Sequence, residues 1–175
     1  MTGIGKIIPL LTNLSFEPSA MEYCFGQRIL YICAGPNSGN LSGSIIAFRI
    51  QIDEVGDEKI KVAIPGTQYV IRPIQNVTNK LVECSAHISG SALKLDKFGN
   101  LHYISKGQTA IMRISSLDIN KLMNVKPRVG MKYMIFNVTS QVLYSNKTTS
   151  YIYSLNGITL EREYLYWTNN PKGTH

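Results

Sequence analysis

The sequence has few charged residues and few cysteines, and it lacks any long apolar run. Only 17% of its 175 residues are charged and 44% are hydrophobic, which excludes an intrinsically disordered chain because enough apolar surface is available for burial. No stretch approaches about 18 uncharged apolar residues, the length expected of a membrane-spanning helix. The three cysteines, Cys24, Cys33 and Cys84, cannot all pair and have no metal-ligand spacing, which favours a reducing compartment.

Residues of the kinds that build catalytic and metal sites are also sparse. The three histidines (His87, His102 and His175) have no ligand spacing, and the four aspartates are scattered along the chain. Cys84 with His87 or His102 would make a nucleophile and base, but nothing around this cysteine indicates an activated thiol. Glycine-rich residues 35–43 lack the Gly-Lys-Ser/Thr of a phosphate loop. We therefore expect no enzyme, no cofactor, no metal site and no small-molecule substrate.

Most of the chain is predicted to form short strands separated by turns. Residues 44–52 alternate apolar and polar from Ile46 onward, and acidic residues 53–58 are typical of a hairpin turn. Pro73 makes the strand over residues 68–74 an edge strand or a short one. The predicted strands cover residues 28–34, 44–52, 59–64, 68–74, 81–88, 92–95, 101–105, 108–114, 132–144, 149–155 and 158–167. This spacing favours a β-barrel or a β-sandwich.

Helices are expected to be few and short. The best candidate is Ser116–Asn124, where Ser116 would cap the helix and Asp118 lies in its first turn. A second, weaker candidate is Met21–Gln27. The sequence thus predicts a mainly β protein, barrel or sandwich, with one or two short helices. We expect a β-rich N-terminal extension or subdomain over residues 1–80 and a barrel domain over residues 81–175, which together could pack as one domain.

Positive charge is confined to one part of the chain. Residues 1–96 hold eight Lys/Arg and eight Asp/Glu, whereas residues 97–160 hold eight Lys/Arg against the single Asp118. The net charge of +7 therefore lies in that second segment. A confined positive field attracts polyanions, meaning nucleic acid or an anionic membrane.

Aromatic residues are interleaved with these cations, and the combination is typical of single-stranded nucleic-acid binding, in which bases stack on rings while Lys and Arg neutralise phosphates. Tyr151 and Tyr153 are predicted to share one strand face, as are Tyr164 and Tyr166. The candidate nucleic-acid-binding residues are Phe98, Tyr103, Arg113, Lys121, Lys126, Arg128, Lys132, Tyr133, Lys147, Tyr151 and Tyr153.

Several segments of the second half follow one another like the elements of a known small barrel. Leu95–Leu101 has the pattern of a strand, turn and strand; residues 116–125 follow as a helix, residues 129–138 as a strand, and residues 151–155 with 158–161 as a closing pair. In this order, residues 81–163 resemble the OB-fold of single-stranded nucleic-acid-binding proteins. The resemblance implies a five-stranded barrel that binds across its second and third strands, with Phe98, Tyr103, Arg113, Tyr133 and Lys147 as candidates by position. The predicted first strand lacks the usual glycine, and residues 1–80 have no counterpart in a minimal OB domain.

Two classes of function fit these features. The first is a non-catalytic protein that binds single-stranded DNA or RNA through the basic, aromatic segment 97–160. The alternative is a self-associating viral structural protein of matrix or coat type, whose basic face would meet nucleoprotein or an anionic membrane and whose apolar segment Ile4–Leu14 would dock onto a neighbouring subunit. An adaptor that pairs strand edges with a partner in a protein complex is a third interpretation. The expected location is the cytoplasm or nucleus, or a virion.

Overall fold

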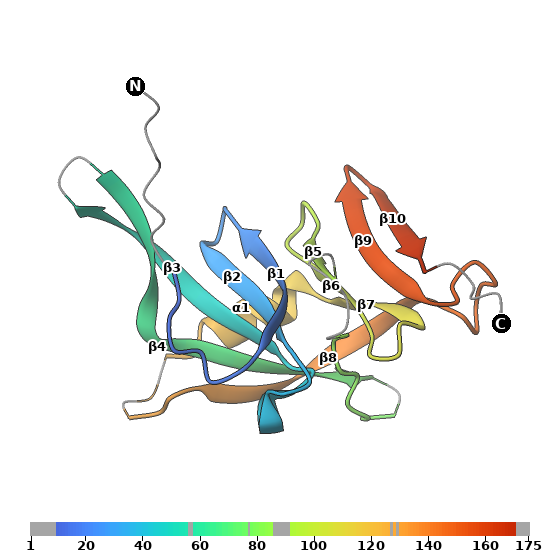
Figure 1. Cartoon of the computed structure of the whole chain (residues 1–175), viewed down its shortest axis with the longest axis horizontal. Coiled ribbons are helices and arrows are strands. Elements are labelled where there is room, and N and C mark those ends of the chain that lie inside the picture. The colour runs from blue at the N-terminus through green and yellow to red at the C-terminus, as the bar shows by residue number, and fades with distance from the viewer. Residues whose placement is uncertain are drawn as a thin grey trace.

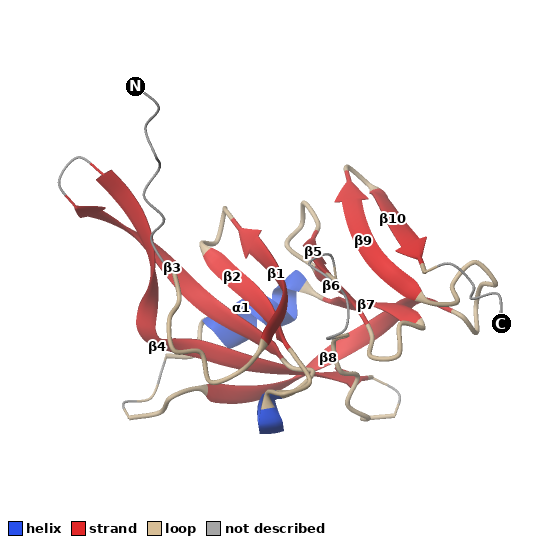
Figure 2. Cartoon of the chain, viewed as in Figure 1, coloured by secondary structure: helices blue, strands red, loops and turns tan. Residues whose placement is uncertain are grey.

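The computed structural model describes residues 10–55, 58–76, 78–85, 92–126, 128 and 130–170. Its elements confirm a mainly β fold with few short helices (Figures 1 and 2). The strands are β1 (Pro18–Cys24), β2 (Ile29–Ala34), β3 (Ile45–Val55), β4 (Glu58–Gln75), β5 (Leu93–Leu95), β6 (Leu101–Ile104), β7 (Ala110–Ile114), β8 (Met134–Ser145), β9 (Leu155–Glu161) and β10 (Tyr164–Asn169). The helices are the 3-10 turn η1 (Gly39–Leu41) and the α-helix α1 (Ser116–Met123).

Eight of these strands form one strongly curved sheet in the order β1-β2-β3-β4-β8-β7-β6-β5. Every pair of neighbours is antiparallel except β4 and β8, which run parallel and join the N-terminal strands to the later ones. The curvature brings the two edge strands together, and Lys94 Nζ of β5 lies 2.9 Å from Glu22 Oε2 of β1. The sheet is therefore a nearly closed barrel, as Figure 1 shows.

The apolar residues of this sheet form two clusters, one on each face. The larger cluster fills the barrel and includes Tyr31, Tyr69 and Tyr103. The smaller cluster lies on the outer face of β2–β4, where Ile46, Phe48, Ile50 and their neighbours are covered by Leu10, Leu11 and Leu14. Strand β2 is buried along its whole length because it faces a cluster on each side, which explains its continuous apolar sequence. Of the predicted docking segment Ile4–Leu14, Leu10, Leu11 and Leu14 thus pack against their own chain, and residues 4–9 lie outside the described residues.

The helix at residues 116–123 is present, and its cap lies one residue earlier than predicted. Ser115 Oγ accepts a hydrogen bond of 3.1 Å from the backbone N–H of Asp118, which satisfies one of the free donors at the start of α1. The weaker helix candidate, Met21–Gln27, is wrong. Residues 21–24 continue β1 and pair in register with Leu30, Tyr31 and other residues of β2, so pairing between strands determines their conformation.

Two of the predicted strands are one. Strand β4 runs through residues 59–74 without a break. Pro65-Gly66, which separates the two predicted strands, lies in β4 where the β3–β4 register shifts between the partners of Phe48 and Ile50. Pro73 lies in this long strand rather than in an edge strand, but the pairing of β3 with β4 has already ended at Ile71. Pro73 pairs with Val138 of β8 on one side, and its carbonyl accepts the N–H of Val82. Proline is disfavoured in central strands because it has no N–H to donate to a neighbouring strand. At this position no hydrogen bond requires that N–H, so Pro73 is tolerated.

Two further strand predictions differ from the structure. The described part of residues 81–88 makes only isolated bridges, Ile74 with Leu81 and Cys84 with Ser105, and residues 86–88 lie outside the described residues. Residues 149–154 are turns and bends rather than a strand. Residues 155–169 form a separate antiparallel hairpin, β9–β10, so the strand predicted over 158–167 contains a turn.

Candidate nucleic-acid interface

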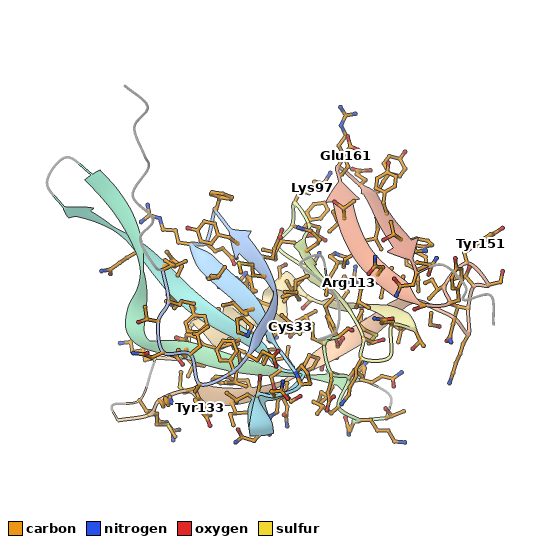
Figure 3. All side chains as sticks on the ribbon, in the orientation of Figure 1. Cys33, Lys97, Arg113, Tyr133, Tyr151 and Glu161 are labelled. Atoms are coloured by element: carbon orange, nitrogen blue, oxygen red, sulfur yellow. The ribbon has the colours of Figure 1, made fainter. Side chains whose placement is uncertain are left out.

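The structure separates the eleven predicted residues into several places. Figure 3 labels Tyr133 at the lower left and Tyr151 at the far right, with Arg113 between them. One group lies together on α1 and the loop that leads to β8: Lys121, Lys126, Arg128, Lys132 and Tyr133. The other six residues lie at the β5–β6 turn, in the core, on β7 and in the β8–β9 connection.

The loop between α1 and β8 is held in place by two residues of the N-terminal strands. The Arg49 guanidinium of β3 donates to the carbonyl of Met123, at the C-terminal end of α1, where a cation also complements the helix dipole. The Tyr69 hydroxyl of β4 donates to the carbonyl of Val125 over 2.9 Å. Because these contacts fix the start of the loop, the cations that follow extend from an ordered base.

The cations of this group are exposed and largely free of carboxylates. Lys121 Nζ lies 3.8 Å from Asp118 Oδ1, one turn earlier on the same helix. Among the side chains that the structure describes, no carboxylate forms an ion pair with Lys126, Arg128 or Lys132. All three cations are exposed, so their positive charge is accessible to an anionic partner.

Two adjoining hollows lie beside these cations. The first, of about 450 Å³, is lined by Arg128, Met131, Tyr133, Met134 and Ile135, together with Val125 and Phe136. The second, of about 300 Å³, shares Val125 and Phe136 and is also lined by Lys121 and Asp118 of α1. Val125, Met131 and Ile135 are 41%, 50% and 43% exposed, so the first hollow has an apolar floor. Arg128 lines the first hollow, and Lys126 and Lys132 are exposed on the same loop beside it. We call the five residues Lys121, Lys126, Arg128, Lys132 and Tyr133, with this floor, the basic groove.

Tyr103 lies in the core and presents no ring to a ligand. Its side chain is 0% exposed, and its hydroxyl donates to the carbonyl of Val82 over 3.1 Å and lies 2.8 Å from Ser140 Oγ. Burial raises the pKa of Tyr103 well above its ordinary value, so the hydroxyl stays neutral. This residue joins β6 to β8 and has a structural place in the barrel.

Phe98 is well exposed but lies in a region of balanced charge. It stands at the tip of the β5–β6 turn, where Lys97 Nζ lies 5.1 Å from its ring centroid and 2.7 Å from Glu163 Oε1. The turn is fixed by Asp96, whose carboxylate accepts the N–H groups of Phe98 and Asn100, each over 2.9 Å.

A cleft of about 670 Å³ beside Phe98 is lined by two rings that were not among the candidates, Tyr144 and Tyr164. One indication of these exposed rings was present in the sequence, the period-two spacing of Tyr164 and Tyr166. Both tyrosines are exposed on one face of β10.

The remaining candidates are dispersed. Arg113 is half-buried on β7 and donates to Gln141 Oε1 of β8 over 2.7 Å. Lys147, Tyr151 and Tyr153 are exposed in the β8–β9 connection. The expectation that Tyr151 and Tyr153 share a strand face is wrong, since this segment is irregular, and the N–H of Tyr153 donates to the Asn169 side chain.

Some of the charge that is separated along the sequence is neutralised in three dimensions. Of the eight cations in residues 97–160, Lys97 pairs with Glu163 and Lys106 pairs with Glu83, and both carboxylates come from outside that segment. Of the other six cations, Lys121, Lys126, Arg128 and Lys132 belong to the basic groove, Lys147 is a separate exposed cation, and Arg113 is half-buried on β7.

Cys84 and His102, which the sequence offered as a nucleophile and a base, are both buried in the structure. Within the described parts of the chain, no three His, Cys, Asp or Glu side chains come close enough to hold a metal ion. Cys84 is buried, and its burial together with a hydrogen bond to Cys33 raises its pKa, which disfavours the reactive thiolate. His102 Nε2 lies 3.1 Å from Asp96 Oδ2, so the pair supports the β5–β6 turn.

No helix among the described residues has the length and apolar character needed to cross a membrane. Comparison of the chain with protein-family models, curated proteins and solved structures finds no match.

Proposed function

We propose that this chain is a non-catalytic nucleic-acid-binding protein that holds single-stranded DNA or RNA in the basic groove. The observation that carries the proposal is a set of four exposed cations on α1 and the following loop, Lys121, Lys126, Arg128 and Lys132, of which Lys121 and Arg128 line two adjoining hollows. Among the described side chains, only Lys121 of these four lies near a carboxylate, that of Asp118. Lys and Arg side chains neutralise phosphates, while the floor and the Tyr133 ring offer apolar surface to unpaired bases.

A single strand suits this groove better than a duplex. The bases of a duplex are stacked within the helix and cannot reach an apolar floor, whereas those of a single strand can turn toward it. The cleft beside Phe98 has more exposed rings, but Asp96 and Glu163 line it alongside Arg162, so its electrostatic attraction for phosphates is weaker.

The test is fluorescence anisotropy of a labelled oligonucleotide of about 20 nucleotides, as single-stranded DNA, single-stranded RNA and duplex, at two salt concentrations. If the four groove cations each contact one phosphate, single-strand affinity should fall by roughly 50-fold between about 50 and 200 mM salt, since each contact contributes about 0.7 to the logarithmic slope. We expect tighter binding of either single strand than of the duplex.

A charge-reversal variant locates the site. Lys126→Glu, Arg128→Glu and Lys132→Glu together should abolish measurable binding, because the groove would then repel phosphates. The matched control reverses three exposed cations that are not among the candidate residues, Arg28→Glu, Lys80→Glu and Arg162→Glu, with the same change in net charge. Equal affinity of the groove variant and the parent would contradict the site assignment, and equal losses in both variants would mean that only net charge matters.

Equal and weak binding of all three oligonucleotides, or no binding, would overturn the proposal. The alternative class, a self-associating structural protein of matrix or coat type, would then take precedence, with the groove facing an anionic membrane or a protein. Flotation of the parent and of the groove variant with vesicles that contain an anionic lipid would distinguish these two partners.

A further inference from the structure

The outer edge of β10 has no strand beside it. In the two-stranded sheet, β10 pairs with β9 alone among the described residues, and Figure 1 shows the hairpin at the upper right with no further strand beyond β10. A two-stranded sheet is marginal by itself, and a third strand would complete it.

The hairpin register shows which backbone groups of β10 are free of β9. Glu161 and Tyr164 pair directly across the two-residue turn Arg162-Glu163, and the register continues through Trp167. In an antiparallel hairpin with a two-residue turn, the flanking pair exchanges hydrogen bonds and alternate residues point outward. The N–H and C=O groups of Leu165 and Trp167 therefore face away from β9.

The edge lacks the features that protect exposed strands from pairing. Natural edges are blocked by charged side chains, by proline or by bulges, but β10 reads YLYWTN, with no charge and no proline, and its only register shift lies at its far end, between Thr168 and Asn169. Its composition, rich in aromatic residues, is that of a strong strand former.

The two faces of β10 are suited to extension. Leu165 and Trp167 are half-buried against the core, and Trp167 lies 5.6 Å from the Tyr144 ring, centroid to centroid. Tyr164 and Tyr166 are 68% and 49% exposed on the opposite face. A strand added to this edge would continue the apolar layer on one face and the tyrosine row on the other.

We propose that the occupant of this edge is β10 of a second copy, paired antiparallel about a two-fold axis. Such pairing matches the outward groups of Leu165 and Trp167 with the same groups of the other copy, which makes the contact self-complementary. Charge also favours it. Residues 161–170 carry two Glu and one Arg in a chain of net charge +7, so two copies can approach through the hairpin without strong repulsion. The basic groove lies away from this hairpin, near Tyr133 in Figure 3, and would stay free in the dimer.

Sedimentation velocity of the full chain over a hundredfold range of concentration tests the dimer. We expect the parent to shift from monomer to dimer, and Tyr166→Lys to weaken the dimer at least tenfold, because it places like charges next to each other at the two-fold axis. Tyr164→Lys, two residues from that axis and opposite Thr168 of the other copy, is a second variant and should weaken the dimer less than Tyr166→Lys does. Tyr151 is also well exposed (75%) but lies outside β10, so Tyr151→Lys is the matched control and should dimerise like the parent.

Amide hydrogen exchange gives a readout specific to the edge. The amides of Leu165 and Trp167 should become protected as the concentration rises, whereas the amide of Tyr166, already bonded to β9, should be protected at every concentration. A parent that stays monomeric throughout, or a dimer whose Leu165 and Trp167 amides remain unprotected, would overturn the proposal. The dimer is independent of the proposed function: the groove variant should dimerise normally and Tyr166→Lys should bind oligonucleotides as a monomer.

Discussion

The hydroxyl of Tyr103 provides the sharpest test of its place in the core. It donates to the carbonyl of Val82 over 3.1 Å and lies 2.8 Å from the hydroxyl of Ser140, and the side chains of Tyr103 and Ser140 are both 0% exposed. Tyr103→Phe keeps the ring and removes only the oxygen, which leaves two polar groups without this partner inside the barrel. A buried group left unsatisfied costs about 1–3 kcal/mol, so we expect a loss of about 2 kcal/mol in the free energy of unfolding.

Thermal and urea unfolding followed by circular dichroism measure this loss. For a chain of this length, about 2 kcal/mol corresponds to a fall in Tm of roughly 4–8 °C. The variant Ser140→Ala removes the other hydroxyl, and the double variant should lose less than the two single variants added together, because the same hydrogen bond is absent in each. Oligonucleotide affinity of the folded Tyr103→Phe protein should equal that of the parent.

Two results would refute this reasoning. Strictly additive losses in the double variant would mean that the two hydroxyls do not interact. An unchanged Tm together with weakened oligonucleotide binding would place the Tyr103 ring at a binding surface, as the sequence alone suggested, and not in the core.

Two other side chains give separate expectations. Burial alone would raise the pKa of Asp96, but hydrogen bonds from neighbouring side chains and backbone amides lower it below its ordinary value of 3.8. The stability that this carboxylate contributes is therefore complete above pH 3.8 and is lost as the pH falls through the lower pKa of the folded state. In urea unfolding at several acidic pH values, Asp96→Asn should remove this part of the loss of stability. An Asp96→Asn protein that loses stability with falling pH as the parent does would contradict this expectation. Gly43 has a φ of +70°, and an added Cβ would overlap the Glu83 side chain, so Gly43→Ala should lower the free energy of unfolding by more than about 1 kcal/mol. Gly39 has a φ of +56° but no atom within 4 Å of an added Cβ, so Gly39→Ala should lower it less. Equal losses of stability in the two variants would refute the steric argument.

The fold class was predictable because burial leaves a local pattern. The alternation of Ile46, Phe48 and Ile50 indicated one buried face, and these residues lie together in the smaller cluster. The helix after β7 was predictable because the serines at its start and its acidic first turn are local signals, although the cap is Ser115 and not the predicted Ser116. Residues 21–27 show the limit of such signals: the partner strand β2 determines their conformation, and no local pattern reports that pairing.

The candidate site was predictable only in part, because burial and pairing across the sheet depend on register. No local sequence pattern distinguishes Tyr103 from Tyr133 as a binding residue. In the structure, Tyr103 faces into the barrel opposite Leu93 and Met112, whereas Tyr133 precedes β8 and lines the groove. In the same way, no local sequence pattern predicts the ion pair between Lys97 and Glu163, because this contact requires the β9–β10 hairpin to lie beside the β5–β6 turn.

The excess of Lys and Arg in residues 97–160 identifies a basic surface only when contacts between distant parts of the sequence are known. Lys97 and Lys106 form ion pairs with carboxylates from outside residues 97–160. Among the described side chains, the α1–β8 loop then holds three exposed cations without an ion pair, Lys126, Arg128 and Lys132. The N-terminal strands also determine the form of that site, since Arg49 of β3 and Tyr69 of β4 hold the carbonyls of Met123 and Val125 at its start. The neutral first half of the chain therefore positions the basic groove without contributing to its charge, and the groove belongs to the whole barrel.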